Sequence, residues 1–219
     1  MNEGIVNMPN KQSGLPLVPA IPTSDTMFIE TETTPNPSSL KFLPGRPVMQ
    51  QGSREFATPE AAEASPLAQG IFDTGEVVNV FFGADFISVT AAPGVSWTDL
   101  KPQVLSILLD HFVSEAPLFA QGSAAGIAVP AEDTDLLVEE REEDADIVAQ
   151  IHELLDTRVR PAVAGDGGDI QYRGYRDGIV HLQMQGACSG CPSSTATLKH
   201  GIEGLLKHYV PEVVEVRAA

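Results

Sequence analysis

Acidic side chains crowd one short stretch of the 219-residue chain. Eight Asp or Glu residues stand between Glu132 and Asp144, with Arg141 as the single basic residue among them. Like charges at this density repel one another and extend the backbone. We therefore expect an acidic, flexible linker over residues 116–144, which divides the chain into two short folded units. The last residues of this stretch fit an acidic helix that runs into the second unit about equally well.

The charge is divided unevenly between the two halves. Residues 1–145 carry 6 basic and 21 acidic side chains, whereas residues 146–219 carry 7 basic and 9 acidic ones. The net charge of −17 argues against a nucleic-acid partner, because a phosphate backbone requires a basic face. No apolar run approaches the ~20 residues that span a bilayer, so we expect no membrane partner either.

Residues 1–26 are expected to form a disordered tail, punctuated by Pro, with one Lys and no Arg. A signal peptide needs a basic start and an apolar middle, and a mitochondrial presequence needs Arg and few acids. Neither pattern is evident, so the sequence predicts a cytoplasmic protein of bacterial type. In such a reducing compartment, paired cysteines are more often ligands or redox groups than structural bridges.

The first folded unit is expected over residues 27–115, as a small α+β domain. Strand patterns occur at residues 27–31, 40–42, 77–82 and 86–90, and the last two are joined as a hairpin. A short helix is predicted directly after Ser65, which is placed to cap it. A second helix carries the apolar repeat of residues 100–112, with Asp99 as its cap and Pro102 in its first turn. No catalytic cluster of residues is apparent in this unit.

The second unit is expected over residues 145–219, as an α+β domain with a three-stranded mixed sheet and two helices. Its first helix has an apolar face from Ile147 to Leu155 and should end before Pro161. Strands are predicted near residues 170–172, 179–184 and 213–216. A second helix lies between the last two strands, and a strand–helix–strand crossover predicts that those strands pair in parallel.

The chemically most specific feature is the segment Cys188-Ser189-Gly190-Cys191, where the second helix begins. A tight loop can aim two cysteines three residues apart at one metal centre. Ser193 or Ser194 is expected to cap the helix, and a helix N-terminus favours the thiolate, which is the ligand and the nucleophile.

Several interpretations of this pair compete. Two buried small side chains fit poorly with a Gly-Ser loop, and a disulfide across so short a loop would add little stability. A zinc site lacks its other ligands, because none of the five histidines has the usual spacing. A thioredoxin-like redox pair has the right spacing and helix position. An iron–sulfur cluster takes four thiolates, so a chain with two cysteines would have to share it with a second copy. Spacing alone leaves zinc, redox and cluster binding roughly level.

Longer segments of the sequence reduce the number of possible roles for the two cysteines. They are residues 160–170 (RPAVAGDGGDI), 186–194 (GACSGCPSS), 197–199 (TLK) and 201–203 (GIE) in the second unit, and residues 34–42 (TPNPSSLKF), 65–68 (SPLA) and 80–89 (VFFGADFISV) in the first. The second unit closely resembles the C-terminal domain of NifU-like (Nfu-type) iron–sulfur carriers. The first unit is similar to the N-terminal Nfu domain of the same family.

The resemblance implies a scaffold or carrier and not an enzyme. Such a protein receives a labile [4Fe–4S] or [2Fe–2S] cluster from upstream cluster-assembly proteins and passes it to apo iron–sulfur proteins. Cys188 and Cys191 match the family's ligands, and the cluster is expected at the interface of a homodimer. The loop is expected to be exposed and flexible, so that an acceptor's thiolates can displace it.

Three expectations complete this comparison. The turn of residues 166–169 matches a family signature and is interpreted as structural, with Gly at positive φ. The first unit contains no cysteine, and we expect it to dock partner proteins or to stabilise the chain. The chain lacks the cysteines of the additional assembly and ferredoxin-like domains of full-length NifU proteins, which favours carriage over de novo assembly. A thiol–disulfide redox protein that uses the same two cysteines remains the alternative.

Overall fold

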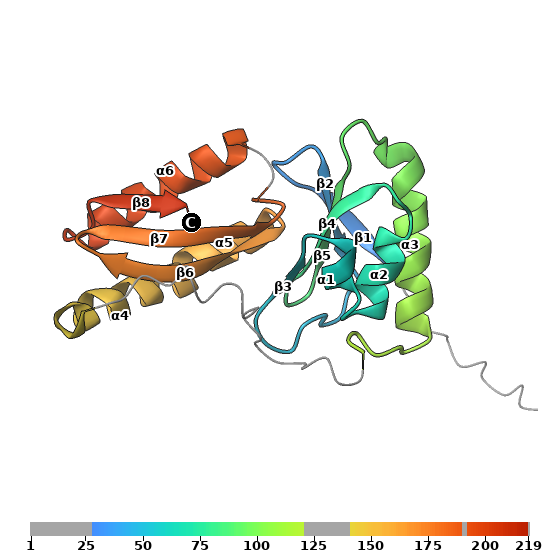
Figure 1. The fold of residues 1–219 in the computed structure, drawn as a ribbon, viewed down its shortest axis with the longest axis horizontal. Coiled ribbons are helices and arrows are strands. Elements are labelled where there is room, and N and C mark those ends of the chain that lie inside the picture. The colour runs from blue at the N-terminus through green and yellow to red at the C-terminus, as the bar shows by residue number, and fades with distance from the viewer. Residues whose placement is uncertain (1–27, 121–140, 190–191, 219) are drawn as a thin grey trace, which may run out of the picture.

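The computed structural model describes residues 28–120, 141–189 and 192–218. They form two α+β units that lie side by side, and the second unit points one end of its sheet toward the sheet of the first (Figure 1). The expectation of two mixed α+β domains is therefore confirmed. The predicted tail of residues 1–26 and most of the predicted acidic linker lie outside the described residues.

The N-terminal unit is built on a five-stranded antiparallel sheet. Its strands are β1 (Glu30–Thr33), β2 (Ser39–Leu43), β3 (Arg54–Phe56), β4 (Val77–Phe82) and β5 (Ile87–Ala91), in the spatial order β1-β2-β5-β4-β3. The predicted hairpin of β4 and β5 is confirmed. Strand β3 was not predicted; it has only three residues and lies at the edge of the sheet.

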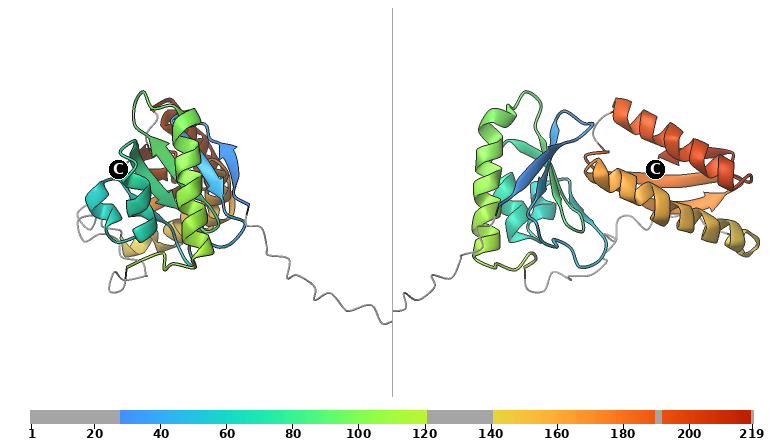
Figure 2. Two further views of the ribbon diagram at one scale, coloured as in Figure 1. Left: turned by 90° about the vertical axis from the view of Figure 1, so that its right-hand side faces the viewer. Right: turned by 180° about the vertical axis from the view of Figure 1, so that it is seen from behind.

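Three helices cover one face of this sheet: α1 (Pro59–Ala62), α2 (Pro66–Phe72) and α3 (Trp97–Val113) (Figure 2). Ser65 caps α2 as predicted, with its hydroxyl accepting from the Ala68 N–H at 3.3 Å. The predicted cap of α3 at Asp99 is wrong, because Ser96 accepts from the N–H of Thr98 and starts the helix earlier. Pro102 consequently lies beyond the first turn, where it removes one backbone hydrogen bond.

The chain stays packed on the N-terminal unit beyond α3. Leu118 and Phe119, which the sequence analysis assigns to the linker, contact the core beneath the helices. The Ser65 hydroxyl donates to the Leu118 carbonyl at 2.6 Å, and the Ala120 N–H donates to the carbonyl of Ala64 at 3.0 Å. These contacts hold residues 118–120 against the start of α2.

The C-terminal unit begins with a long helical segment that continues past a proline. Helix α4 (Ala145–Leu154) passes into one π-helical turn (Leu155–Val159) and then into α5 (Arg160–Gly165). The predicted end before Pro161 is therefore wrong. The wider π turn comes directly before the proline, which occupies the first turn of α5, where its missing N–H is tolerated.

The sheet of the C-terminal unit contains β6 (Gly168–Arg176), β7 (Ile179–Gly186) and β8 (Glu215–Ala218), in that order. β6 and β7 are antiparallel, whereas β7 and β8 are parallel and joined by α6 (Pro192–Tyr209), so the predicted mixed sheet and crossover are confirmed. The helices of this unit lie on one face of its sheet (Figure 2). None of the helices in the described parts of the chain is long and apolar enough to cross a membrane.

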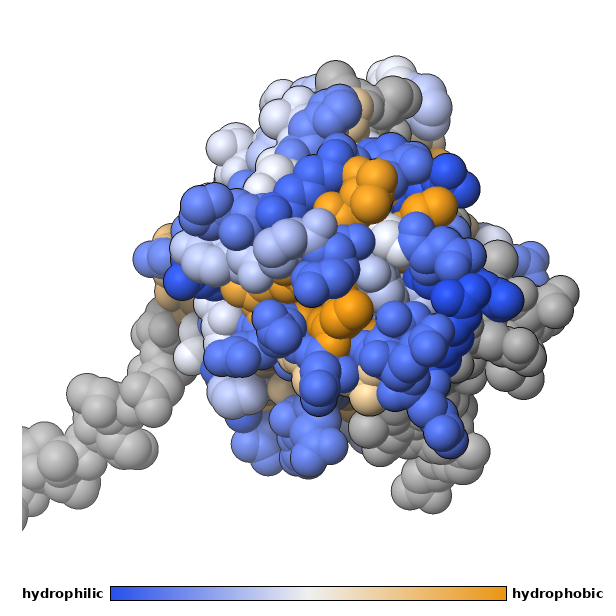
Figure 3. Space-filling model, turned by 90° about the vertical axis from the view of Figure 1, so that its left-hand side faces the viewer, coloured by the Kyte–Doolittle hydropathy of each residue, from blue (hydrophilic) through white to orange (hydrophobic). Residues whose placement is uncertain are grey.

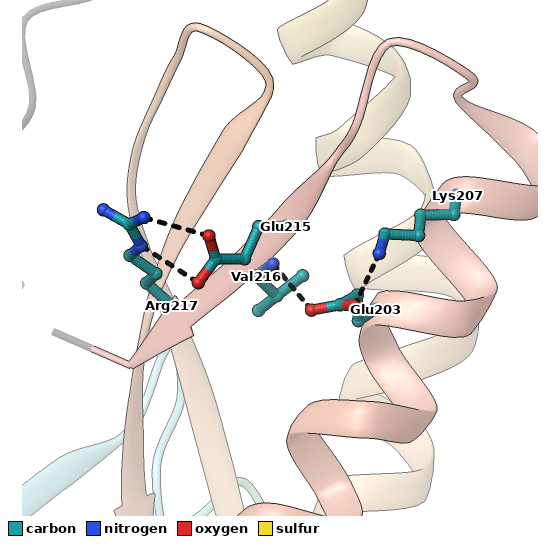
Figure 4. Close-up of polar contacts among 5 residues, drawn as sticks. All are labelled: Glu203, Lys207, Glu215, Val216 and Arg217. Carbon is teal, nitrogen blue, oxygen red and sulfur yellow. Dashed lines mark hydrogen bonds and ion pairs between the residues drawn. The ribbon is translucent and has the colours of Figure 1, made fainter.

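Glu203 attaches α6 to the last strand. Its carboxylate accepts from the Val216 N–H at 3.1 Å and from Lys207 Nζ at 2.6 Å, while Glu215 pairs with Arg217 on β8 (Figure 4). The first bond satisfies a backbone donor of the edge strand, so it helps to fix where α6 lies against the sheet.

Candidate metal centre

Two turns of the C-terminal unit meet at the candidate site. The turn between α5 and β6 carries Gly167, and the turn after β7 leads through Gly186 into the cysteine segment. The Ala187 N–H donates to the Gly167 carbonyl at 3.1 Å, which joins the two turns. Ser189 bonds back to the Gly186 carbonyl through its hydroxyl at 2.8 Å. The segment that carries Cys188 is therefore held in a compact turn.

Two glycines allow the backbone to pass close to Cys188. Gly186 has φ of 68°, a left-handed conformation that L side chains rarely adopt. Gly168 is required by close approach instead, because a Cβ at this position would lie 2.8 Å from the Cys188 sulfur and would clash with the Gln185 carbonyl. The first strand of the sheet thus leaves just enough space for the thiol.

Cys188 is buried, with 6% of its surface exposed, and its side chain packs in the hydrophobic core of the C-terminal unit. The Thr195 hydroxyl of α6 donates to its carbonyl at 2.8 Å. The expectation of an exposed cysteine is therefore wrong for Cys188 in this conformation. The Gly-Ser composition of the loop misled the prediction, because the turn folds this residue inward under β6.

Burial also changes the acidity of the thiol. Desolvation raises the pKa of Cys188 to about 12 from its ordinary value of 9.0, and the nearby carboxylates of Asp166 and Asp169 add to the rise. The expectation that the helix N-terminus favours a thiolate is wrong for this residue as it is placed here. Cys188 is a neutral, unreactive thiol in this state.

The second predicted ligand, Cys191, lies outside the described residues together with Gly190. That the two sulfurs converge remains a prediction. Helix α6 begins at Pro192, and the side chains of Ser193 and Ser194 are not among the described ones, so their capping role stays a prediction. Within residues 28–120, 141–189 and 192–218, no three His, Cys, Asp or Glu side chains gather as a metal site.

A cavity of about 530 Å³ runs between α5 and α6 and has Cys188 in its wall. The other lining residues are mostly apolar and include Val159, Leu198 and Ile202. Pro35, from the N-terminal unit, completes the wall. Cys188 therefore borders a cavity to which residues of both units contribute.

The turn of residues 166–169 has the structural role that the sequence analysis assigned to it. Gly167 has φ of 84°, and one carboxylate oxygen of Asp169 accepts from the N–H of Ile170 at 2.8 Å. The other oxygen accepts from the Ser53 hydroxyl of the N-terminal unit at 2.7 Å. Asp169 is thus occupied by hydrogen bonds that shape and dock the turn.

The N-terminal unit supplies residues that the sequence analysis did not connect with the site. Asn36 Nδ2 donates to the Ala187 carbonyl at 3.2 Å, and a Glu55 oxygen accepts from the Gly186 N–H at 2.9 Å. Glu55 and Gly186 are 131 residues apart in the chain. No local pattern could have revealed such a contact, because it depends on how the two units dock.

Comparisons with known proteins agree with this architecture. The chain matches two protein-family models, "Scaffold protein Nfu/NifU N terminal" over residues 29–115 and "NifU-like domain" over residues 151–217. It is 53% identical over 190 residues to NifU-like protein 4, mitochondrial, of Arabidopsis thaliana, which covers 86% of this chain and 64% of that protein. It is 48% identical over 188 residues to NFU1 iron-sulfur cluster scaffold homolog, mitochondrial, of Homo sapiens, covering 85% and 70%. The chain thus spans a little under two thirds of the plant relative's length.

A solution NMR structure of a NifU-like protein from Saccharomyces cerevisiae is also similar. It covers 43% of this chain and 86% of its own, with 25% identity and a TM-score of 0.40. A score this low does not by itself establish a shared fold.

Fold and site together define a two-domain α+β protein whose second domain is NifU-like and carries a cysteine turn before a helix. With 48% identity to a relative of which it covers 70%, the chain belongs to the Nfu/NifU-like scaffold protein family. The resemblance stated from the sequence is confirmed in both units.

The expected cellular location is contradicted by the same comparisons. A cytoplasmic protein of bacterial type was predicted from the sequence, but the plant and human relatives are mitochondrial proteins. A targeting segment is recognised by an import receptor and does not take part in the packing of the domains. The charge pattern of residues 1–26 was therefore a poor guide to where these two domains work.

Proposed function

We propose that this protein is an iron–sulfur cluster scaffold and carrier. Two copies hold a labile [4Fe–4S] or [2Fe–2S] cluster as cargo between their Cys188 and Cys191 side chains and pass it to apo iron–sulfur proteins. The observation that carries the proposal is the ligand count. The chain has two cysteines, three residues apart, whereas clusters of both types take four cysteine thiolates.

The relatives and the turn geometry support this proposal. The human relative is named as an iron–sulfur cluster scaffold homolog, and the NifU-like domain model includes the cysteine segment. Cys188 lies in the short turn between β7, which ends at Gly186, and α6, which begins at Pro192. Because only the thiolate is a ligand, loading must displace the proton that the buried thiol keeps.

The same features favour lability. When Cys188 leaves the cluster, it recovers both its proton and its packing in the core of the C-terminal unit. These gains offset part of the lost iron–sulfur bonding, so an acceptor with free thiolates can take the cluster over. A thiol–disulfide redox role would need the same deprotonation of Cys188, so burial does not separate the two functions, and the naming of the human relative as a cluster scaffold homolog favours the scaffold.

Anaerobic reconstitution of the full chain with iron and sulfide tests the proposal. We expect a brown protein that contains about two irons per chain for a [4Fe–4S] cluster, or about one for a [2Fe–2S] cluster, if two chains share it. Cys188→Ser and Cys191→Ser should each abolish cluster retention while the fold of the N-terminal unit is unchanged. His200→Ala removes an exposed potential ligand on α6 and should load like the wild type.

Transfer is measured by mixing the loaded protein with an apo iron–sulfur enzyme and following the recovery of enzyme activity. A colourless chain with a measurable dithiol–disulfide equilibrium would contradict the proposal and support the redox alternative.

A further inference from the structure

The N-terminal sheet is covered on both faces. Strand β4 ends with Val80, Phe81 and Phe82, an apolar run without the alternation that a sheet with one buried face shows. Val80 and Phe82 point into the core beneath the helices. Phe81 lies on the other face and does not belong to that core, yet only 1% of it is exposed. The C-terminal unit lies on this second face (Figure 2).

Four residues on this outer face stand in one row across the sheet. Lys41 on β2 is directly opposite Ser88 on β5, Ser88 is opposite Phe81 on β4, and Phe81 is opposite Glu55 on β3. We call Lys41, Ser88, Phe81 and Glu55 the cap row. Lys41 and Ser88 are buried although both are polar, with 8% and 2% exposed.

One half of the cap row binds the turn between α5 and β6. The Ser88 hydroxyl donates to the Gly167 carbonyl at 2.6 Å, and Lys41 Nζ donates to the Gly165 carbonyl at 3.4 Å. A Cβ at position 167 would lie 2.8 Å from the Ser88 hydroxyl oxygen, so the Ser88 side chain touches the backbone of the turn. These bonds explain why two polar side chains are buried on a sheet surface.

The other half binds the turn that precedes Cys188. The Phe81 ring lies against Gly186, where a Cβ would be 2.9 Å from the ring. One Glu55 oxygen accepts from the Gly186 N–H at 2.9 Å, and it lies 3.3 Å from the Ser189 hydroxyl, whose single proton it shares with the Gly186 carbonyl. The cap row therefore contacts a residue on each side of Cys188, the Gly186 backbone and the Ser189 side chain, while Cys188 packs in the core of its own domain.

The far end of the C-terminal unit contrasts with this face. Figure 3 shows its hydrophobic residues as separate spots among hydrophilic ones. Val214, beside the turn at Gly178, is 64% exposed there. The aromatic and hydrogen-bonding contacts with the N-terminal sheet are made by the opposite end of the C-terminal unit, which carries Cys188. We therefore favour that end as the site of a specific interaction.

We propose that the cap row of the N-terminal sheet closes on the cysteine turn of the same chain when no cluster is bound, and leaves it when the turns of two copies share a cluster. This inference rests on the proposed scaffold function. A thiol that packs in the core of its own domain cannot bridge to a second chain, so sharing requires the turn to move outward. The cap row occupies the surface that the turn and the second copy then need.

A hydrogen-exchange experiment on the full chain tests the cap. Phe81→Arg should open it without unfolding the N-terminal unit, because Phe81 lies outside that unit's core. Val78→Arg is the matched control, since Val78 is 43% exposed on the same strand. In the cluster-free protein, we expect amide exchange over residues 183–189 to be about tenfold faster, or more, in the Phe81 variant, and to be unchanged in the control.

Cluster loading completes the test. We expect the loaded wild-type protein to lose the protection of the Gly186 amide, which donates to Glu55 in the cluster-free protein, and the Phe81 variant to load faster than the control. Protection that is equal in the Phe81 variant and the wild type would overturn the cap. Protection that persists in the loaded protein would overturn the exclusion between cap and cluster. If neither the wild type nor any variant loads a cluster, the proposed scaffold function is wrong, and so is the exclusion between cap and cluster. Amide exchange in the cluster-free chains still decides whether the cap exists.

Discussion

Raising the pH should destabilise the cluster-free C-terminal unit through one buried thiol. The pKa of Cys188 is raised to about 12 in the folded protein, mainly by burial, from an ordinary value of 9.0. Between these two values the unfolded chain releases a proton that the folded chain retains, so stability falls as the pH rises. Below pH 9.0 both states are protonated, and the group has little effect on stability.

The size of the effect follows from the two pKa values. Each tenfold difference in proton affinity corresponds to about 1.4 kcal/mol, so the full rise from 9.0 to about 12 is worth about 4 kcal/mol at most. Between pH 9 and pH 10 we expect a loss of about 1 kcal/mol, because the unfolded thiol is half ionised at the lower of these values.

Urea unfolding of the reduced, cluster-free chain, followed by circular dichroism at a series of pH values, measures this loss. Cys188→Ala is the control, because every other titrating group remains. Among these is Tyr175, whose pKa is also raised by burial. The free energy of unfolding should fall more steeply with pH in the wild type than in the variant. Parallel slopes would refute the inward, desolvated placement of the Cys188 thiol.

Two further predictions concern packing. Gly168→Ala should destabilise the C-terminal unit by about 1–3 kcal/mol in urea unfolding, because its Cβ would lie 2.8 Å from the Cys188 sulfur. Gly204→Ala on α6 meets nothing within 4 Å and should instead stabilise that unit by about 0.5–1 kcal/mol; equal effects of the two would contradict the close approach at Gly168. Phe82→Ala should cost the N-terminal unit about 3–5 kcal/mol, since the ring is fully buried in its core, and a loss below about 1 kcal/mol in thermal or urea unfolding would show that this core is misassigned.

Much of the fold followed from local patterns. The hairpin of β4 and β5, the Ser65 cap and the parallel crossover to β8 each depend on a few neighbouring residues, and each was predicted. The continuation of the helix through Pro161 was not predicted. A π-helical turn accommodates the proline there, and such a turn has no clear sequence signal. The short edge strand β3 and the start of α3 were not predicted either. A single contact determines each of them, and a local sequence pattern does not reveal it.

The candidate site was likewise predicted only in part. The sequence located the two cysteines, and family resemblance supplied their expected role. The burial of Cys188 could not be predicted, because it depends on the close passage of β6 at Gly168. The contact of Glu55 with Gly186 depends on docking between domains, which neither hydrophobic periodicity nor motif spacing encodes. The unbroken apolar end of β4 was the one sequence signal that the outer face is covered.

The central claim is that two chains share one cluster through Cys188 and Cys191. Native mass spectrometry of the anaerobically reconstituted full chain tests it most directly. The account predicts a species with the mass of two chains plus one cluster, which returns to apo chains when the cluster is chelated and is absent from both Cys→Ser variants. A cluster found on single chains, or a dimer of the same abundance in the Cys→Ser variants, would contradict it.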